Sequence, residues 1–161
     1  MLLCVSPVAA QTGGADTPSG TYYLYNTGRG QYLTAASDGT LSLASHGTAV
    51  SVSGEWGAYT MSMGGRLLGG LLGQPVTAGA TVSTKWQLRR ASSDAGSYVI
   101  GNMQLEANAY ANMYFSTATQ QLATTTAMPD GTFTYALWRL VSEADYLSNA
   151  VTLRQEDTQY A

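Results

Sequence analysis

The residues of this chain that are best suited to bind a ligand combine aromatic rings with amide or carboxylate groups. A sugar ring stacks its apolar face on an aromatic side chain, while Asp, Asn or Gln side chains hydrogen-bond to its hydroxyls. Three places in the chain offer this combination: Trp56 beside Glu55, the stretch from Asn108 to Tyr114, and Tyr32 near Gln31 and Asp38. The candidate ligand-binding residues there are Asp38, Trp56, Asn108, Tyr110, Asn112 and Tyr114. The chemistry that they indicate is carbohydrate binding without covalent change.

Each of these places also fits a purely structural role. Trp56 could cover the end of a barrel, and the stretch from Asn108 to Tyr114 could be an ordinary strand with its tyrosines facing inward. Asp38 stands directly before Gly39, a pair that is typical of a tight turn. The binding and the structural interpretation both stay open.

Groups that could carry catalysis are scarce. His46 is the single histidine and lies in a segment typical of a turn, and the chain contains no Gly-x-Ser-x-Gly motif. A glycosidase needs two carboxylates across a cleft, but Asp38 and Asp130 each precede a glycine and are typical turn residues. Neither a metal-ligand spacing nor a phosphate-binding glycine loop is present. We therefore expect no enzyme activity, no cofactor and no metal site.

The composition excludes several other classes of function. Only 11% of the 161 residues are charged, against about 25% in an ordinary globular domain. The net charge is −3, and Lys85 is the single lysine, so we expect no nucleic-acid partner. The one cysteine, Cys4, excludes a disulfide framework.

The two ends of the chain differ from its middle. Residues 1–11 are apolar and end in small side chains, which predicts the remnant of a secretory signal peptide; a first β-strand is the alternative. They are too few to span a bilayer, so we expect no transmembrane segment and a secreted or cell-surface location. Residues 12–19 are expected to be a linker, and a domain is expected over 20–141.

After residue 141 the pattern changes. Ser142 can cap a short helix whose first turn contains Glu143 and Asp145. Residues 142–161 are therefore expected to form a linker or the start of a further, covalently linked domain; a free tail is the alternative.

The middle of the chain contains three similar units. Each begins with an aromatic and aliphatic run after a glycine: Gly20–Tyr25, Gly57–Met61 and Gly96–Ile100. Repeats of about 40 residues point to a repetitive architecture. The second and third units end in Trp-x-Leu, at Trp86 and Trp138, and Val50 takes the place of the tryptophan in the first.

Short strands, not helices, fill these units. Apolar residues flank single polar ones at Leu41–Leu43, Trp86–Leu88 and Trp138–Leu140, so one face of each strand is apolar and the other polar. Turn signals separate the runs, for example at Asn26–Gly30 and Gly64–Gly65. The register of the third unit stays open.

The chain resembles the ricin-type β-trefoil (ricin B-like lectin) family, in the divergent form of secreted proteins from gut-type Bacteroidetes. The opening phrase Tyr22–Leu33 and the closing Trp-x-Leu carry the resemblance. It implies an all-β fold in which three hairpins close a six-stranded barrel with pseudo-threefold symmetry; the short C-terminal helix is expected from the residues after 141 and not from the resemblance. A β-sandwich or another small barrel is the alternative. The expected core residues are Leu24, Leu33, Leu43, Val50, Leu68, Trp86, Leu88, Ile100, Trp138 and Leu140.

The sugar-binding residues of that family cannot be carried over to this sequence. The family pattern has a glutamine two residues before the tryptophan, where this chain has Thr84 and Ala136. We expect a non-catalytic binding module of a larger secreted bacterial protein, with a carbohydrate or cell surface as its ligand. The alternative is a structural spacer or protein-interaction domain that binds no sugar.

Overall fold

The computed structural model describes residues 19–55, 58–70, 73, 76–92, 96–104, 109–127 and 133–148. The predicted signal-peptide remnant (1–11), most of the predicted linker that follows it and residues 149–161 lie outside this part of the chain. So do Trp56, Asn108 and the turn predicted around Asp130.

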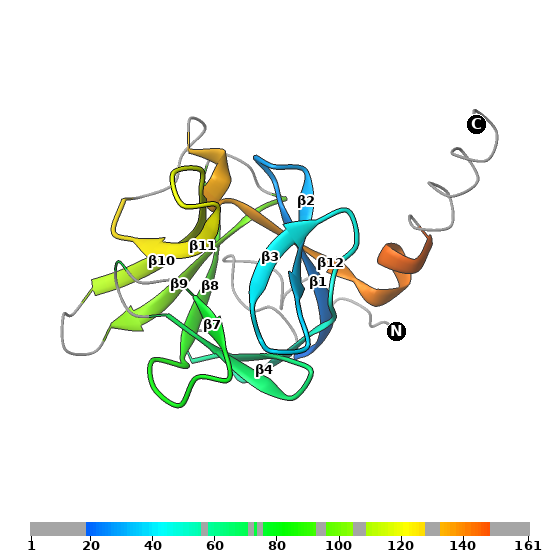
Figure 1. The fold of residues 1–161 in the computed structure, drawn as a ribbon, viewed down its shortest axis with the longest axis horizontal. Coiled ribbons are helices and arrows are strands. Elements are labelled where there is room, and N and C mark those ends of the chain that lie inside the picture. Colours follow the sequence, from blue (N-terminus) through cyan, green and yellow to red (C-terminus); the bar gives the residue numbers. More distant parts are fainter. Residues whose placement is uncertain are drawn as a thin grey trace, which may run out of the picture.

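Short β-strands make up most of the described residues (Figure 1). In chain order they are β1 (Gly20–Asn26), β2 (Gln31–Ala35), β3 (Leu41–Ala44), β4 (Val50–Ser53), β5 (Thr60–Met63), β6 (Arg66–Gly69), β7 (Thr77–Ala78), β8 (Trp86–Arg90), β9 (Tyr98–Gln104), β10 (Ala109–Ser116), β11 (Gln121–Thr125) and β12 (Trp138–Ser142). A 3₁₀ turn, η2 (Thr134–Ala136), precedes β12, and residues 143–148 are helical.

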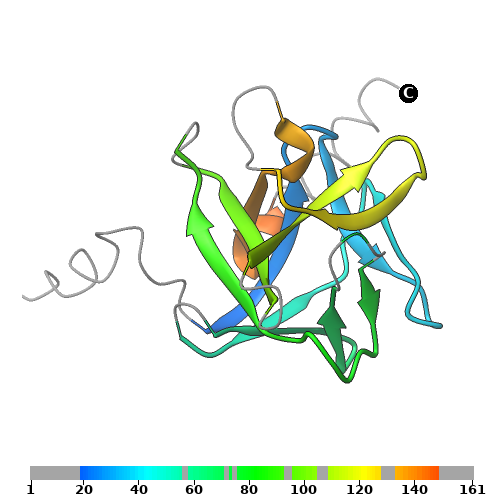
Figure 2. The same ribbon diagram turned by 90° about the vertical axis from the view of Figure 1, so that its left-hand side faces the viewer.

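The strands form one antiparallel sheet that curls around a common interior (Figures 1 and 2). Strand β1 pairs with both β4 and β12, β4 pairs with β5, and β9 pairs with both β8 and β12. A bridge between Tyr59 and Trp86 joins the residue before β5 to the first residue of β8. Three hairpins extend from these strands: β2–β3, β6–β7 and β10–β11.

Alternation and turn chemistry explain why these residues form these strands. In β4 the two valines are buried and the two serines exposed, which is the pattern of a half-buried strand. Gly64 and Gly65, with φ of +59° and +80°, make the two-residue turn between β5 and β6 that the sequence predicts. The structure also fixes the third unit's register, because its hairpin strands are β10 and β11.

All ten expected core residues belong to one hydrophobic cluster. Eight of them are fully buried, and Leu43 and Leu140 are partly buried against the cluster. The two large indoles are held by hydrogen bonds as well as by packing. Trp86 Nε1 donates to the Leu68 carbonyl at 3.0 Å, and Trp138 Nε1 donates to the Met113 carbonyl at 2.9 Å. The prediction of one shared core is therefore confirmed.

One residue departs from the predicted alternation. The pattern places Gln87 on a solvent-facing side of β8, but its side chain is only 4% exposed. Gln87 lies opposite Gly101 of β9, which lies opposite the buried Asn112 of β10. Arg89 Nη2 also donates to Asn112 Oδ1 at 3.3 Å. Gln87, Gly101 and Asn112 are therefore in register across three strands, and Gln87 Oε1 is buried there without a hydrogen-bond partner in the described structure.

Candidate functional site

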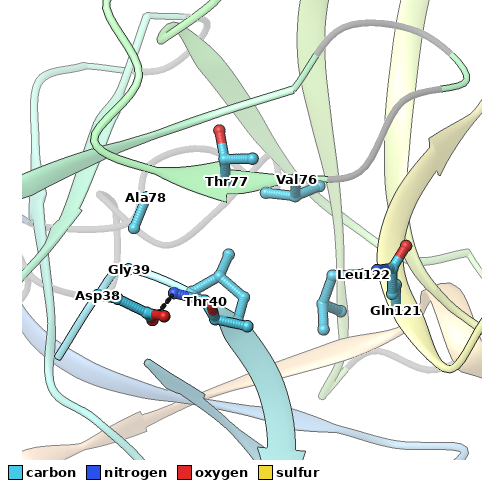
Figure 3. A pocket seen from close by; sticks show the side chains of 9 residues that line it. Asp38, Gly39, Thr40, Val76, Thr77, Ala78, Gln121 and Leu122 are labelled. Atoms are coloured by element: carbon cyan, nitrogen blue, oxygen red, sulfur yellow. Dashed lines mark hydrogen bonds between the residues drawn. The ribbon is translucent and has the colours of Figure 1, made fainter. Parts of the chain in front are cut away.

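A hollow of about 270 Å³ lies where three segments from different parts of the chain meet (Figure 3). The segments are Asp38–Leu41 at the start of β3, Val76–Ala78 at β7, and Gln121–Leu122 at the start of β11. Each hairpin thus contributes the beginning of its second strand. The Val76 N–H donates to the Leu122 carbonyl at 2.9 Å and ties two of the segments together.

The hollow has an apolar floor and a polar rim. Leu41, Val76 and Leu122 are buried and belong to the main core cluster, so the floor is continuous with the core. The rim side chains are exposed, and they are Asp38, Thr40, Thr77 and Gln121. A floor of this kind accepts the apolar face of a ring, while the rim offers one carboxylate, two hydroxyls and one amide for hydrogen bonds.

A local turn fixes Asp38 at the rim. Gly39 has a φ of +92°, which favours glycine, and its N–H donates to the Ala36 carbonyl at 2.9 Å. Asp38 Oδ1 accepts a hydrogen bond from the Thr40 N–H at 2.9 Å, as in other Asx turns (Figure 3). The turn that the sequence predicts therefore also places the carboxylate beside the hollow.

The surroundings of Asp38 favour its charged form. The hydrogen bonds from the backbone and side chain of Thr40 lower the pKa of the Asp38 carboxyl, and the nearby charge of Arg66 lowers it further. An ionised carboxylate accepts hydrogen bonds and donates none, so it suits a ligand that presents hydroxyl groups.

The candidate residues whose side chains the structure describes do not come together in one site. Asn112 is 2% exposed, and its Nδ2 donates to the Ala127 carbonyl at 3.1 Å in addition to the Arg89 bond on its Oδ1. Tyr114 is half-buried, with its ring tilted against that of Phe133 at 5.6 Å. Tyr110 lies in β10 opposite Met103.

Of the three candidates whose side chains the structure describes, Asp38, Asn112 and Tyr114, only Asp38 lines the hollow. Trp56, Asn108 and the Tyr110 side chain are outside the described part of the structure, so their role in binding stays a prediction.

Sequence reasoning missed the other rim residues, Thr40, Thr77 and Gln121. None of them is part of a motif, and they lie far apart in the chain. They share a position that no local sequence signal marks, because each lies at or just before the start of the second strand of a hairpin.

A second feature is a cluster of four half-buried tyrosines, Tyr23, Tyr25, Tyr32 and Tyr146. The rings of Tyr23 and Tyr146 stack at 3.7 Å, and Tyr146 also meets Tyr32 edge to face at 5.0 Å. The Gly47 N–H donates to the Tyr146 hydroxyl at 2.9 Å. The helical residues 143–148 are thereby attached to β1 and β2.

Groups for catalysis or metal binding are not gathered in the described residues. His46 is exposed. The described ranges contain no group of three or more His, Cys, Asp or Glu side chains that could hold a metal ion. In the same ranges no helix is long and apolar enough to cross a membrane.

Comparison with known proteins gives matches in structure only. No protein-family model and no curated protein matches the chain. Among solved structures, a ricin B-like lectin of Macrolepiota procera in complex with lactose matches with a TM-score of 0.64 at 12% identity, over 78% of this chain and 97% of the lectin. SeviL bound to the asialo-GM1 saccharide matches with a TM-score of 0.61 at 18% identity, over 78% of this chain and 99% of SeviL.

A proteinase inhibitor from Coprinopsis cinerea also matches, with a TM-score of 0.61 at 13% identity, over 78% of this chain and 99% of the inhibitor. The class that these matches define is a fold of the ricin B-like, β-trefoil type. At such identities the likeness concerns the fold alone, since one fold hosts unrelated functions.

Proposed function

We propose that this chain is a non-catalytic binding module of a larger secreted protein, and that its ligand is a carbohydrate. The observation that carries the proposal is the hollow at the starts of β3, β7 and β11, with the Asp38 carboxylate on a polar rim above an apolar floor. Carbohydrates combine apolar ring faces with hydroxyl groups, and this arrangement complements both.

The proposal includes three pseudo-repeats of a β-trefoil, made of β1–β4, β5–β8 and β9–β12. The strand pairing supports it, because the first and fourth strands of each unit meet, and each fourth strand pairs with the first strand of the next unit. Trp86 and Trp138 begin the fourth strands of the second and third units, and the buried Val50 begins that of the first.

Two of the similar structures were solved with lactose or with the asialo-GM1 saccharide, which supports a sugar ligand here. The proposed site lies at the junction of the hairpins. It does not use the sugar-binding residues of the lectin family, because this chain has Thr84 and Ala136 where the family pattern has glutamine. A binding module needs no catalytic group, which agrees with the exposed position of His46.

A glycan array with the purified domain, followed by calorimetry on the best binder, tests the proposal. We expect Asp38→Ala to weaken binding about tenfold or more, because hydrogen bonds to a charged group are among the strongest that a site can lose. Gln121→Ala should weaken it less, and His46→Ala, the control outside the hollow, should leave it unchanged. An array without any binder, or an Asp38→Ala variant that binds like the wild type, would contradict the proposal.

A structural spacer is the second candidate function, and the tyrosine cluster favours it. Tyr146 attaches the helical residues 143–148 to the domain by a ring stack and a hydrogen bond. The orientation of the segment after β12 relative to the strands is therefore fixed. This candidate predicts that Tyr146→Ala changes the relative orientation of this domain and its neighbour in the full-length protein, measured by small-angle scattering. Scattering that is the same for both proteins would count against it.

A further inference from the structure

A second hollow, of about 280 Å³, adjoins the one that contains Asp38. Gly39 and Ala78 line both hollows and form the ridge between them. The second hollow is lined further by Ser37, Thr48 and the buried Met63, with Arg66 at its edge. The two hollows therefore form one continuous surface on which a single ligand can lie.

Arg66 is the positively charged residue on this surface. It is the first residue of β6, directly after the Gly64–Gly65 turn, and its side chain is exposed. The guanidinium lies over Gly39, since a Cβ atom on Gly39 would come within 2.8 Å of Arg66 Nη1. Glycine at this position leaves the space that the guanidinium occupies.

The charges on the two sides of the ridge are opposite. Asp38 lines the first hollow and Arg66 the second. The chain has only seven basic residues and a net charge of −3, so the surface as a whole does not attract anions. The Arg66 guanidinium is therefore a local positive charge beside the second hollow, and its paired N–H donors fit a carboxylate.

The size of the hollows indicates how much of a ligand they hold. Pockets for small ligands measure about 300–1,000 Å³, and each hollow alone falls just below that range. Both together fall within it. A ligand that contacts both Asp38 and Arg66 extends across the ridge, and two linked rings can do so.

We propose that the two hollows bind one acidic disaccharide unit, with its carboxylate on Arg66 and the hydroxyls of the neighbouring ring on Asp38. This inference rests on the proposed function and adds to it the class of sugar and the residue that selects it. The carboxylate could come from a sialic acid or from a uronic acid, and the chemistry at Arg66 is the same for both.

Calorimetry with matched pairs of sugars tests the inference. The first pair is sialyllactose and lactose, and the second is a glucuronic-acid-containing disaccharide and its neutral counterpart. We expect the acidic member of at least one pair to bind about fivefold or more tighter, as a partly exposed charged hydrogen bond allows. The pair that shows the difference identifies the source of the carboxylate.

Two variants that each replace one arginine with glutamine test whether the preference depends on Arg66 itself or only on the net charge. Arg66→Gln should abolish the preference, so that the acidic and the neutral member of a pair bind alike, whereas Arg139→Gln, at an exposed position of β12, should keep the wild-type preference. Arg66→Lys should recover part of the preference, because lysine keeps the charge without the paired donors.

The outcomes separate this inference from the proposed function. Neutral sugars that bind as tightly as acidic ones, with Arg66→Gln behaving like the wild type, would overturn the inference and leave carbohydrate binding in place. A protein that binds none of the four sugars and nothing on the array would overturn both.

Discussion

At the scale of single residues, two indole N–H groups connect the core to the backbone. Trp86 and Trp138 each donate to a buried carbonyl, and replacement by phenylalanine would leave that carbonyl without its partner. An unsatisfied buried polar group costs about 1–3 kcal/mol, so we expect Trp86→Phe and Trp138→Phe each to lower the free energy of unfolding by at least that much. Urea unfolding followed by circular dichroism measures it. Variants as stable as the wild type would show that these hydrogen bonds contribute nothing.

Asp38 leads to a prediction about pH. The hydrogen bonds from Thr40 and the charge of Arg66 lower its pKa below the ordinary 3.8, so the carboxylate stays ionised through neutral and mildly acidic conditions. Sugar binding that depends on the charge should be constant down to about pH 4 and should be lost as the pH falls through the lowered pKa. Asp38→Asn should weaken binding and remove this acid limb.

Calorimetry at a series of pH values, with circular dichroism to confirm that the fold persists, measures the effect. A loss of binding centred near pH 6 would show that a group other than Asp38 controls the pH dependence of binding.

Single residues were predicted with uneven success, for a physical reason. The core residues could be predicted from the alternation of apolar and polar residues, because the buried face of a strand must be apolar whichever strand packs against it. Asp38 was a candidate because Tyr32 and Gln31 lie near it in the sequence; Asp38 does line a hollow, whereas Tyr32 packs in the tyrosine cluster. Asn112 has the same chemistry as a sugar-binding amide, but Arg89 and the Ala127 carbonyl engage it, and such partners on other strands cannot be read from local sequence.

At the scale of elements, the helical residues 143–148 depend on one tyrosine for their place. Ser142 caps them as predicted, since its Oγ accepts a hydrogen bond from the Asp145 N–H at 3.2 Å. We expect Tyr146→Ala to speed hydrogen exchange in this segment, and Tyr146→Phe, which loses only the bond from Gly47, to have a smaller effect. Leu147→Ala is the control, because Leu147 is 55% exposed. Equal exchange in all these proteins would contradict the attachment.

The same contact predicts a response to alkaline pH. Burial raises the pKa of the Tyr23 hydroxyl, and the charges of Glu143 and of ionised Tyr146 raise it further. The attachment favours neutral Tyr23, so it persists below the ordinary value of 10 and weakens as the pH rises through the elevated pKa. Glu143→Gln should lower the pKa of Tyr23.

Ultraviolet titration of tyrosinate, compared with Tyr23→Phe to isolate the signal, measures the shift. The same tyrosine titration in the Glu143→Gln variant and the wild type would show that Glu143 does not act on Tyr23.

The strands could be predicted where a turn signal borders them. The Gly64–Gly65 pair and the Asp38–Gly39 pair each mark a hairpin that the structure contains. In the second unit the second strand of the hairpin is β7, at Thr77–Ala78. A two-residue strand has too few side chains to show alternation, so pairing with β6 decides its position, and that pairing is not local.

At the scale of the whole molecule, one curled sheet encloses one core (Figure 1). The three hairpins meet at a hollow whose floor is continuous with that core. The repeated units in the sequence predicted this type of fold, and the similar solved structures agree with it. The meeting point of the hairpins is a property of the assembled sheet, because it depends on the pairing of strands that are far apart in the chain. Sequence motifs therefore could not reveal the hollow.

The central claim is that a carbohydrate binds where β3, β7 and β11 begin. Nuclear magnetic resonance of the isotope-labelled domain, titrated with the best sugar from the array, tests it most directly. The account predicts that the largest shifts fall on the amides of Asp38–Leu41, Val76–Ala78 and Gln121–Leu122 together. Shifts confined to β10 or to the tyrosine cluster, with those three segments unchanged, would contradict it.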